Sequence, residues 1–174
     1  MAESNKACGE LDAVRRGVRL LVMDVDGTLT DGKIYMGPAG EAMKAFDIKD
    51  GYAIANMLPA AGIVPAVITG RESAIVANRC AELGIRHLYQ GRQDKPAAFR
   101  ELLGQVSAEL GVEMTGAQAA YLGDDLIDLP CMQLCAVRGC PADAAKEVKA
   151  VCQFVSRKDG GNGAAREFIE WLVG

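Results

Sequence analysis

The chain has 174 residues, of which 50% are apolar and 24% are charged, and its formal net charge is −4. This length and composition are typical of one globular domain, so we expect 1–174 to form a single domain. The acidic balance argues against nucleic acid or a membrane surface as a partner, and a single histidine leaves little material for a zinc–histidine site. Because no apolar run approaches ~18 residues and the N-terminus lacks an apolar signal core, we expect a cytoplasmic protein.

Short apolar runs alternate with amphipathic stretches after an N-terminal extension, 1–17. The predicted strands are 18–25, 63–69, 85–89, 118–123, 134–138 and 150–155. The predicted helices are 51–61, 72–83, 95–110, 126–133, 142–149 and 164–173. Because alternation of this kind implies right-handed crossovers, it predicts an α/β fold with a doubly wound, Rossmann-like parallel sheet. The segment 32–48 breaks the rhythm, and its two short extended runs around the turn sequence GPAG predict a β-hairpin.

Acidic clusters follow two of the predicted strands. The first strand ends in DVDGT, where Asp24 and Asp26 point the same way on extended backbone, and the second cluster, GDDLID, contains Asp124, Asp125 and Asp128. A solvated turn or a helix cap would account for either cluster alone. Because the carboxyl ends of parallel strands meet at one edge, the two clusters together predict an all-oxygen site suited to Mg²⁺.

Two other helix starts carry groups suited to an anion. Thr69-Gly70-Arg71 follows a predicted strand and leads into a helix, where a hydroxyl and backbone N–H groups form an anion pocket. Lys95 lies in the first turn of a helix and works against its dipole, so it favours a nearby anion. The alternative for Lys95 is a solvated surface lysine.

The order DVDGT, TG, Lys95 and GDDLID resembles the haloacid dehalogenase superfamily of phosphohydrolases. The longer stretches DVDGTLTDGKIYMG, AFDIKDGY, ITGRES and GGNGAARE resemble the 3-deoxy-D-manno-octulosonate 8-phosphate (KDO 8-phosphate) phosphatases from residue 18 to the end. The resemblance implies a Mg²⁺-dependent phosphomonoesterase that acts on a sugar acid phosphate and serves lipopolysaccharide biosynthesis.

The resemblance also assigns roles to residues. Asp24 corresponds to the nucleophile, Asp26 to the general acid and base, and Thr69 and Lys95 to the groups that hold the phosphoryl oxygens. The implied Mg²⁺ ligands are the Asp24 side chain, the Asp26 carbonyl and Asp124, with Asp125 and Asp128 as auxiliary carboxylates. The implied substrate contacts are Asp26, Asp47, Ile48, Lys49, Asp50, Gly51, Thr69, Gly70, Arg71, Arg79 and Lys95.

The spacing of the motifs leaves no room for a cap domain. Thr30 to Thr69 holds a hairpin, one helix and one strand, and Thr69 to Lys95 holds one helix and one strand. Similar capless phosphatases form tetramers in which the hairpin and neighbouring subunits close the site. We therefore expect a homotetramer, with the hairpin 32–48 as its assembly element.

One residue departs from the octulosonate pattern, since Ala55 in DGYAIA stands where an arginine is expected. This departure leaves open a related phosphatase acting on a nonulosonate (sialic-acid-type) 9-phosphate. A third possibility is a non-catalytic oligomerisation module, because similar domains are appended to sugar cytidylyltransferases. That reading predicts the loss of the acidic residues, whereas Asp24, Asp26 and Asp124 all remain.

Overall fold

The structure is a computed structural model that describes residues 2–174, with side chains described from residue 9 onward. Within these residues a six-stranded parallel sheet has the order β5-β4-β1-β6-β7-β8. The strands are β1 (Leu20–Met23), β4 (Val64–Ile68), β5 (His87–Tyr89), β6 (Ala119–Leu122), β7 (Val137–Cys140) and β8 (Phe154–Val155). The predicted doubly wound parallel sheet is thus confirmed.

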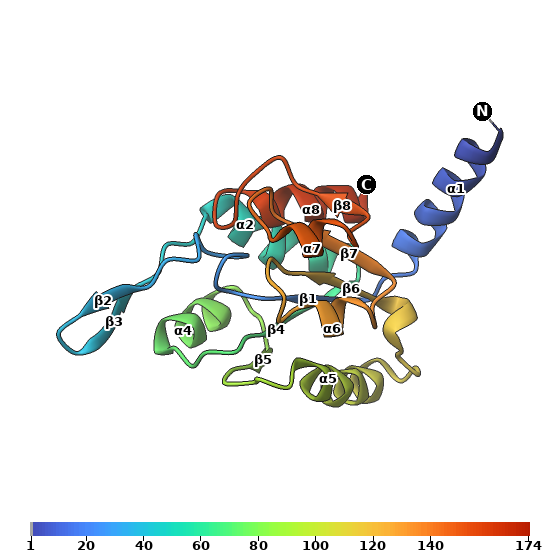
Figure 1. Ribbon diagram of the computed structural model, residues 1–174. Helices are drawn as coiled ribbons and strands as arrows, with labels where there is room; N and C mark the ends of the chain where they lie inside the picture. The colour runs from blue at the N-terminus through green and yellow to red at the C-terminus, as the bar shows by residue number, and fades with distance from the viewer. Residues whose placement is uncertain (1) are drawn as a thin grey trace.

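Helices cover both faces of this sheet (Figure 1). They are α1 (Ala2–Arg16), α2 (Ile48–Tyr52), η1 (Ala53–Met57, a π-helical turn), α3 (Leu58–Ala60), α4 (Ala74–Glu82), α5 (Lys95–Leu110), η2 (Gly116–Gln118, a 3-10 turn), α6 (Leu129–Met132), α7 (Lys146–Lys149) and α8 (Ala164–Val173). Successive residues of β1 point to opposite faces: Leu21 packs in the core cluster that contains Phe168 of α8, and Leu20 in the one that contains Phe99 of α5. Burial on both faces explains why β1 is apolar throughout.

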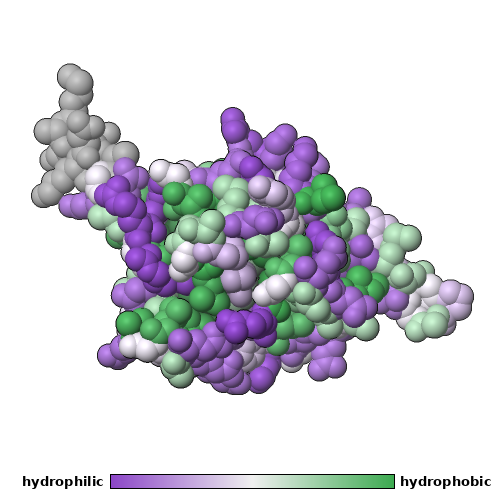
Figure 2. Space-filling model, turned by 180° about the vertical axis from the view of Figure 1, so that it is seen from behind, coloured by the Kyte–Doolittle hydropathy of each residue, from purple (hydrophilic) through white to green (hydrophobic). Residues whose placement is uncertain are grey.

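The hairpin consists of β2 (Tyr35–Gly37) and β3 (Gly40–Met43), which pair antiparallel and project from the body of the molecule (Figure 1). It lies within the predicted segment 32–48. Figure 2 shows pale green apolar side chains on this projection, and Met36 and Met43 are 66% and 57% exposed. No cap domain is formed by the residues that the structure describes.

Several element boundaries differ from the sequence prediction. The strand predicted at 134–138 lies instead at Val137–Cys140, because the N–H groups of Leu134 and Cys135 close turns at the end of α6. The helix predicted at 51–61 begins earlier, where the Asp47 side chain accepts from the Lys49 N–H (2.6 Å) and caps α2. The predicted helices 126–133 and 142–149 shorten to α6 and α7.

The N-terminal extension is helical, which the sequence analysis did not predict. The helix α1 contacts α8, and the Arg15 guanidinium lies 4.7 Å from the centroid of the Trp171 ring. In the part of the chain that the structure describes, we find no helix with the length and apolar character needed to span a membrane.

Candidate active site

The strand order brings the predicted site residues together at the carboxyl edge of the sheet. Because β4, β1 and β6 are neighbours, Thr69, Asp24 and Asp124 follow three adjacent strands. A cleft of about 250 Å³ opens at this edge. Its lining residues are Asp24, Asp26, Thr69, Gly70, Arg71, Gln93, Lys95, Asp124, Asp125 and Ile127.

Lys95 is completely buried beneath this cleft, which excludes the alternative of a solvated surface lysine. Its Nζ lies 2.9 Å from Asp24 Oδ1 and 2.7 Å from Asp128 Oδ1. Burial acts to lower the pKa of Lys95, but the charges of the two carboxylates outweigh it, and the net direction is upward. Lys95 is therefore a buried cation at the first turn of α5, which Asp94 caps by accepting from the Ala97 N–H (3.0 Å).

Asp128 organises the floor of the site. Its Oδ1 accepts hydrogen bonds from Lys95 Nζ and from the Tyr121 hydroxyl (2.8 Å), and its Oδ2 accepts from the backbone N–H groups of Asp124 (3.0 Å) and Asp125 (3.2 Å). This carboxylate therefore fixes both the lysine and the loop that carries Asp124. The sequence analysis missed Tyr121, because a tyrosine inside an apolar strand carries no local signal of a polar partner.

The carboxylates suit a divalent cation. Oxygen atoms of Asp24, Asp124 and Asp128 lie within 4.8 Å of one another, and Asp24 Oδ1 is buried with no hydrogen-bond partner among the described residues, although Lys95 Nζ is near. Burial, reinforced by the charge of Asp128, raises the pKa of Asp24 to about 6. Burial, together with the negative charges of the neighbouring carboxylates, also raises the pKa of Asp124 to about 7. A cation between them would offset this repulsion, and an all-oxygen donor set fits Mg²⁺.

Gly27 and Thr28, which follow Asp26, pack against Asp124. Gly27 has a φ of +90°, and a Cβ at this position would lie 2.1 Å from Asp124 Oδ2, so a side chain here would collide with the carboxylate. The Thr28 hydroxyl donates to Asp124 Oδ1 (2.7 Å). Of the three grouped carboxylates, Asp128 already accepts four hydrogen bonds, which leaves Asp24 and Asp124 available to a metal.

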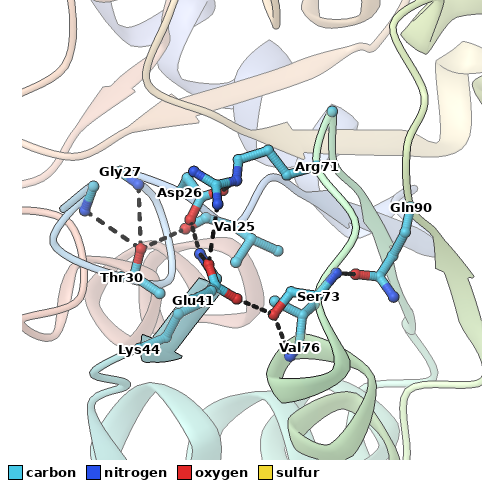
Figure 3. Close-up of polar contacts among 12 residues, drawn as sticks. Val25, Asp26, Gly27, Thr30, Glu41, Lys44, Arg71, Ser73, Val76 and Gln90 are labelled. Carbon is cyan, nitrogen blue, oxygen red and sulfur yellow. Dashed lines mark hydrogen bonds and ion pairs between the residues drawn. The ribbon is translucent and has the colours of Figure 1, made fainter. Parts of the chain in front are cut away.

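Asp26 faces a cluster of charged side chains that the sequence analysis did not identify (Figure 3). Lys44 donates to Asp26 Oδ1 and lies 3.0 Å from Glu41 Oε1. Arg71 Nη2 lies 3.3 Å from the same Glu41 oxygen, and Arg71 Nε lies 3.8 Å from Asp26 Oδ2. Two hairpin residues thus reach the edge of the cleft.

Six of the predicted substrate contacts do not line this cleft. Asp50 is buried, and its carboxylate accepts from the backbone N–H groups of Gly163 (3.3 Å) and Arg166 (2.6 Å) at the start of α8. Arg79 pairs with Glu82 at 2.8 Å. The six residues are Asp47, Ile48, Lys49, Asp50, Gly51 and Arg79. Ala55 also lies elsewhere, in a hollow beside the beginnings of β4 and β5.

The parallel sheet and the carboxylate site at its edge define a protein of the haloacid dehalogenase superfamily. A structure assigned to subfamily III A of that superfamily, from Legionella pneumophila, superposes with a TM-score of 0.87 at 32% identity, covering 99% of this chain and 91% of that chain. No family model matches the chain.

More specific similarity comes from two phosphatases. The 3-deoxy-D-manno-octulosonate 8-phosphate phosphatase KdsC of Escherichia coli K12 is 44% identical over 161 residues, which cover 92% of this chain and 82% of KdsC. The crystal structure of the corresponding phosphatase from Moraxella catarrhalis, in complex with magnesium, phosphate and KDO, superposes with a TM-score of 0.83 at 38% identity, covering 94% of this chain and 90% of that chain. The chain therefore belongs to the family of KDO 8-phosphate phosphatases, which confirms the resemblance carried by its motifs.

Proposed function

We propose that this protein is a Mg²⁺-dependent phosphatase that hydrolyses KDO 8-phosphate to KDO and phosphate. The observation that carries the proposal is that buried Asp24 and Lys95 and half-buried Asp124 line one cleft, in a chain 44% identical to KdsC. The complex of the Moraxella catarrhalis relative with magnesium, phosphate and KDO supports both the cofactor and the sugar acid.

In the proposed mechanism, an oxygen of Asp24 attacks phosphorus and the bond to the sugar C8 oxygen breaks, leaving a phosphoryl group on Asp24. Asp26 gives its proton to the departing sugar oxygen. Water then attacks the phosphoryl group, Asp26 takes the proton of that water, and phosphate leaves as the Asp24 carboxylate is restored. Thr69 and Lys95 hold the phosphoryl oxygens during both steps.

Mg²⁺ would be held by the Asp24 side chain, the Asp26 main-chain carbonyl and Asp124, and when bound it offsets the negative charge of the carboxylates and the phosphate. Asp128 and Asp125 are auxiliary carboxylates that are not ligands themselves. Asp128 accepts hydrogen bonds from Lys95 and from the backbone N–H of Asp124, and these bonds keep the lysine and the ligand loop in place.

We also propose that Arg71, 42% exposed at the cleft, binds the carboxylate of the sugar acid, since a guanidinium matches that group in shape and charge. The protein would act in the cytoplasm as a homotetramer and supply KDO for lipopolysaccharide. Exposed Met36 and Met43 on the projecting hairpin provide apolar surface for that assembly. In such a tetramer, Lys49 or Arg79 of one subunit would contact the substrate in the cleft of a neighbouring subunit.

The proposed function is tested by phosphate release from purified protein with Mg²⁺ and with EDTA. The substrates are KDO 8-phosphate, a nonulosonate 9-phosphate and p-nitrophenyl phosphate, with Asp24→Asn as the inactive control. We expect the highest kcat/KM for KDO 8-phosphate and no turnover in EDTA. A higher kcat/KM for the nonulosonate ester would overturn the substrate assignment, and absence of turnover on every ester would overturn the enzymatic reading.

A further inference from the structure

Four charged side chains form a closed ring beside the cleft, in which cations and anions alternate (Figure 3). Lys44 bonds to Asp26 and to Glu41, and Arg71 lies against the same two carboxylates from the other side. Two members come from the hairpin segment, Glu41 within β3 and Lys44 directly after it, one from the loop after β1 and one from the loop after β4. The ring therefore joins the hairpin directly to the carboxylate that the proposed function uses as acid and base.

The two cations of this ring differ in their access to solvent. The Lys44 side chain is 1% exposed, whereas the Arg71 side chain is 42% exposed. A lysine that is buried to this extent is stable only if its charge is compensated, and the compensating groups are Asp26 and Glu41. Arg71 therefore has the exposed surface to meet a substrate in the cleft, whereas the Lys44 side chain faces the two carboxylates.

Glu41 holds Lys44 in this position. Its other oxygen, Oε2, accepts a hydrogen bond from the Ser73 hydroxyl, and the Ser73 N–H donates to Gln90 Oε1 (2.8 Å). Ser73 is also the N-cap residue of α4, where its side chain accepts from the Val76 N–H (3.4 Å). The carboxylate of Glu41 thus ties β3 to the start of α4.

From this geometry we propose that Lys44 is a positioning residue that holds the Asp26 carboxylate at the cleft for proton transfer to the leaving group. The inference rests on the proposed function, in which Asp26 protonates the sugar oxygen. When Arg71 leaves the ring to bind substrate, Lys44 still fixes the orientation of Asp26. The hairpin is then a part of the proton-transfer apparatus as well as a surface for assembly.

Leaving-group dependence tests this role, because a sugar alkoxide needs a proton from Asp26 and a nitrophenolate needs far less. We expect Lys44→Met to lower kcat on KDO 8-phosphate on the order of 30-fold, and kcat on p-nitrophenyl phosphate by less than about 3-fold. Lys44→Arg should recover part of the loss, because it restores a cation. Lys33→Met is the matched control: Lys33 belongs to the same hairpin segment but its side chain is 72% exposed, and this variant should match wild type on both esters.

Equal losses on both esters, or no loss on either, would overturn the positioning role. Lys44→Gln, which keeps a donor in the buried position, replaces Lys44→Met if that variant does not fold, with the same expected selectivity. A crystal structure of the variant gives a readout independent of turnover: we expect the Asp26 carboxylate to leave its place, and an unmoved carboxylate would refute the inference. If wild type hydrolyses the aryl ester but not KDO 8-phosphate, the proposed function fails, and the position of Asp26 in the variant still decides the role of Lys44.

Discussion

Replacement of Asp128 by asparagine tests whether this carboxylate holds the site together. The side chain is fully buried, and the four groups that surround it are all donors: Lys95 Nζ, the Tyr121 hydroxyl and the backbone N–H groups of Asp124 and Asp125. Asparagine has the same shape but only one acceptor oxygen. Whichever way the asparagine amide is turned, its NH₂ group replaces one carboxylate oxygen and leaves two of the four donors without an acceptor.

The cost follows from these contacts. A buried donor left without an acceptor costs about 1–3 kcal/mol, and removal of one partner of a buried ion pair costs about 3–5 kcal/mol. Lys95 retains Asp24 at 2.9 Å, so the loss is not that of a fully orphaned charge. We expect Asp128→Asn to lower the free energy of unfolding by about 4 kcal/mol, which for a domain of this size lowers Tm by about 8–16 °C. The kcat on KDO 8-phosphate should fall at least about 10-fold, because Lys95 and the Asp124 loop lose their support.

Urea unfolding followed by circular dichroism, in EDTA, measures the stability change without a contribution from bound metal. Asp125→Asn is the matched control, since it removes the same charge from an exposed neighbour whose side chain accepts from the Leu126 N–H (2.8 Å). This control should lie within about 0.5 kcal/mol of wild type. If the free energy of unfolding of Asp128→Asn lies within about 1 kcal/mol of the wild-type value, the four hydrogen bonds do not stabilise the site.

Asp24→Asn should lower kcat at least about 10,000-fold while leaving the circular dichroism spectrum unchanged, since an amide of the same shape cannot accept the phosphoryl group. EDTA should abolish phosphate release, Mg²⁺ should restore it, and Ca²⁺ should restore it poorly because its coordination is larger and looser. Burial raises the pKa of Asp50 from 3.8 to about 6, so the native protein retains a proton at Asp50 that the unfolded chain has lost, and the stabilising contribution of Asp50 is lost as pH rises from about 4 to about 6. In Asp50→Asn this loss, up to about 3 kcal/mol in the free energy of unfolding, should be absent. Urea unfolding at pH values of about 4 and about 6 measures it, and a difference between variant and wild type that is the same at both pH values would contradict the prediction. Ile34→Asp combined with Met36→Asp should convert a tetramer into smaller species in sedimentation experiments, and a wild-type monomer would refute the assembly role of the hairpin.

Residues next to one another in the chain determined much of the site. The apolar runs before Asp24, Thr69 and Asp124 predicted strands buried on both faces, and the alternation with helices placed their carboxyl ends at one edge. The structure has all three side chains around one cleft. The hairpin was also predictable, because the turn sequence and its flanking extended runs are local features.

Other features depended on contacts between residues far apart in the chain. Asp50 caps α8 through N–H groups more than a hundred residues away, which no local pattern indicates. Lys44 reaches Asp26 only because the hairpin folds back onto the loop after β1, and Lys95 reaches Asp128 only because α5 and the loop after β6 meet at the same edge of the sheet. Hydrophobic period and turn residues are encoded locally, so the sequence by itself determined the strands, the hairpin and the order of the motifs. The partner of each buried polar group is set by the packing of distant elements, so only the tertiary structure decided which charges meet.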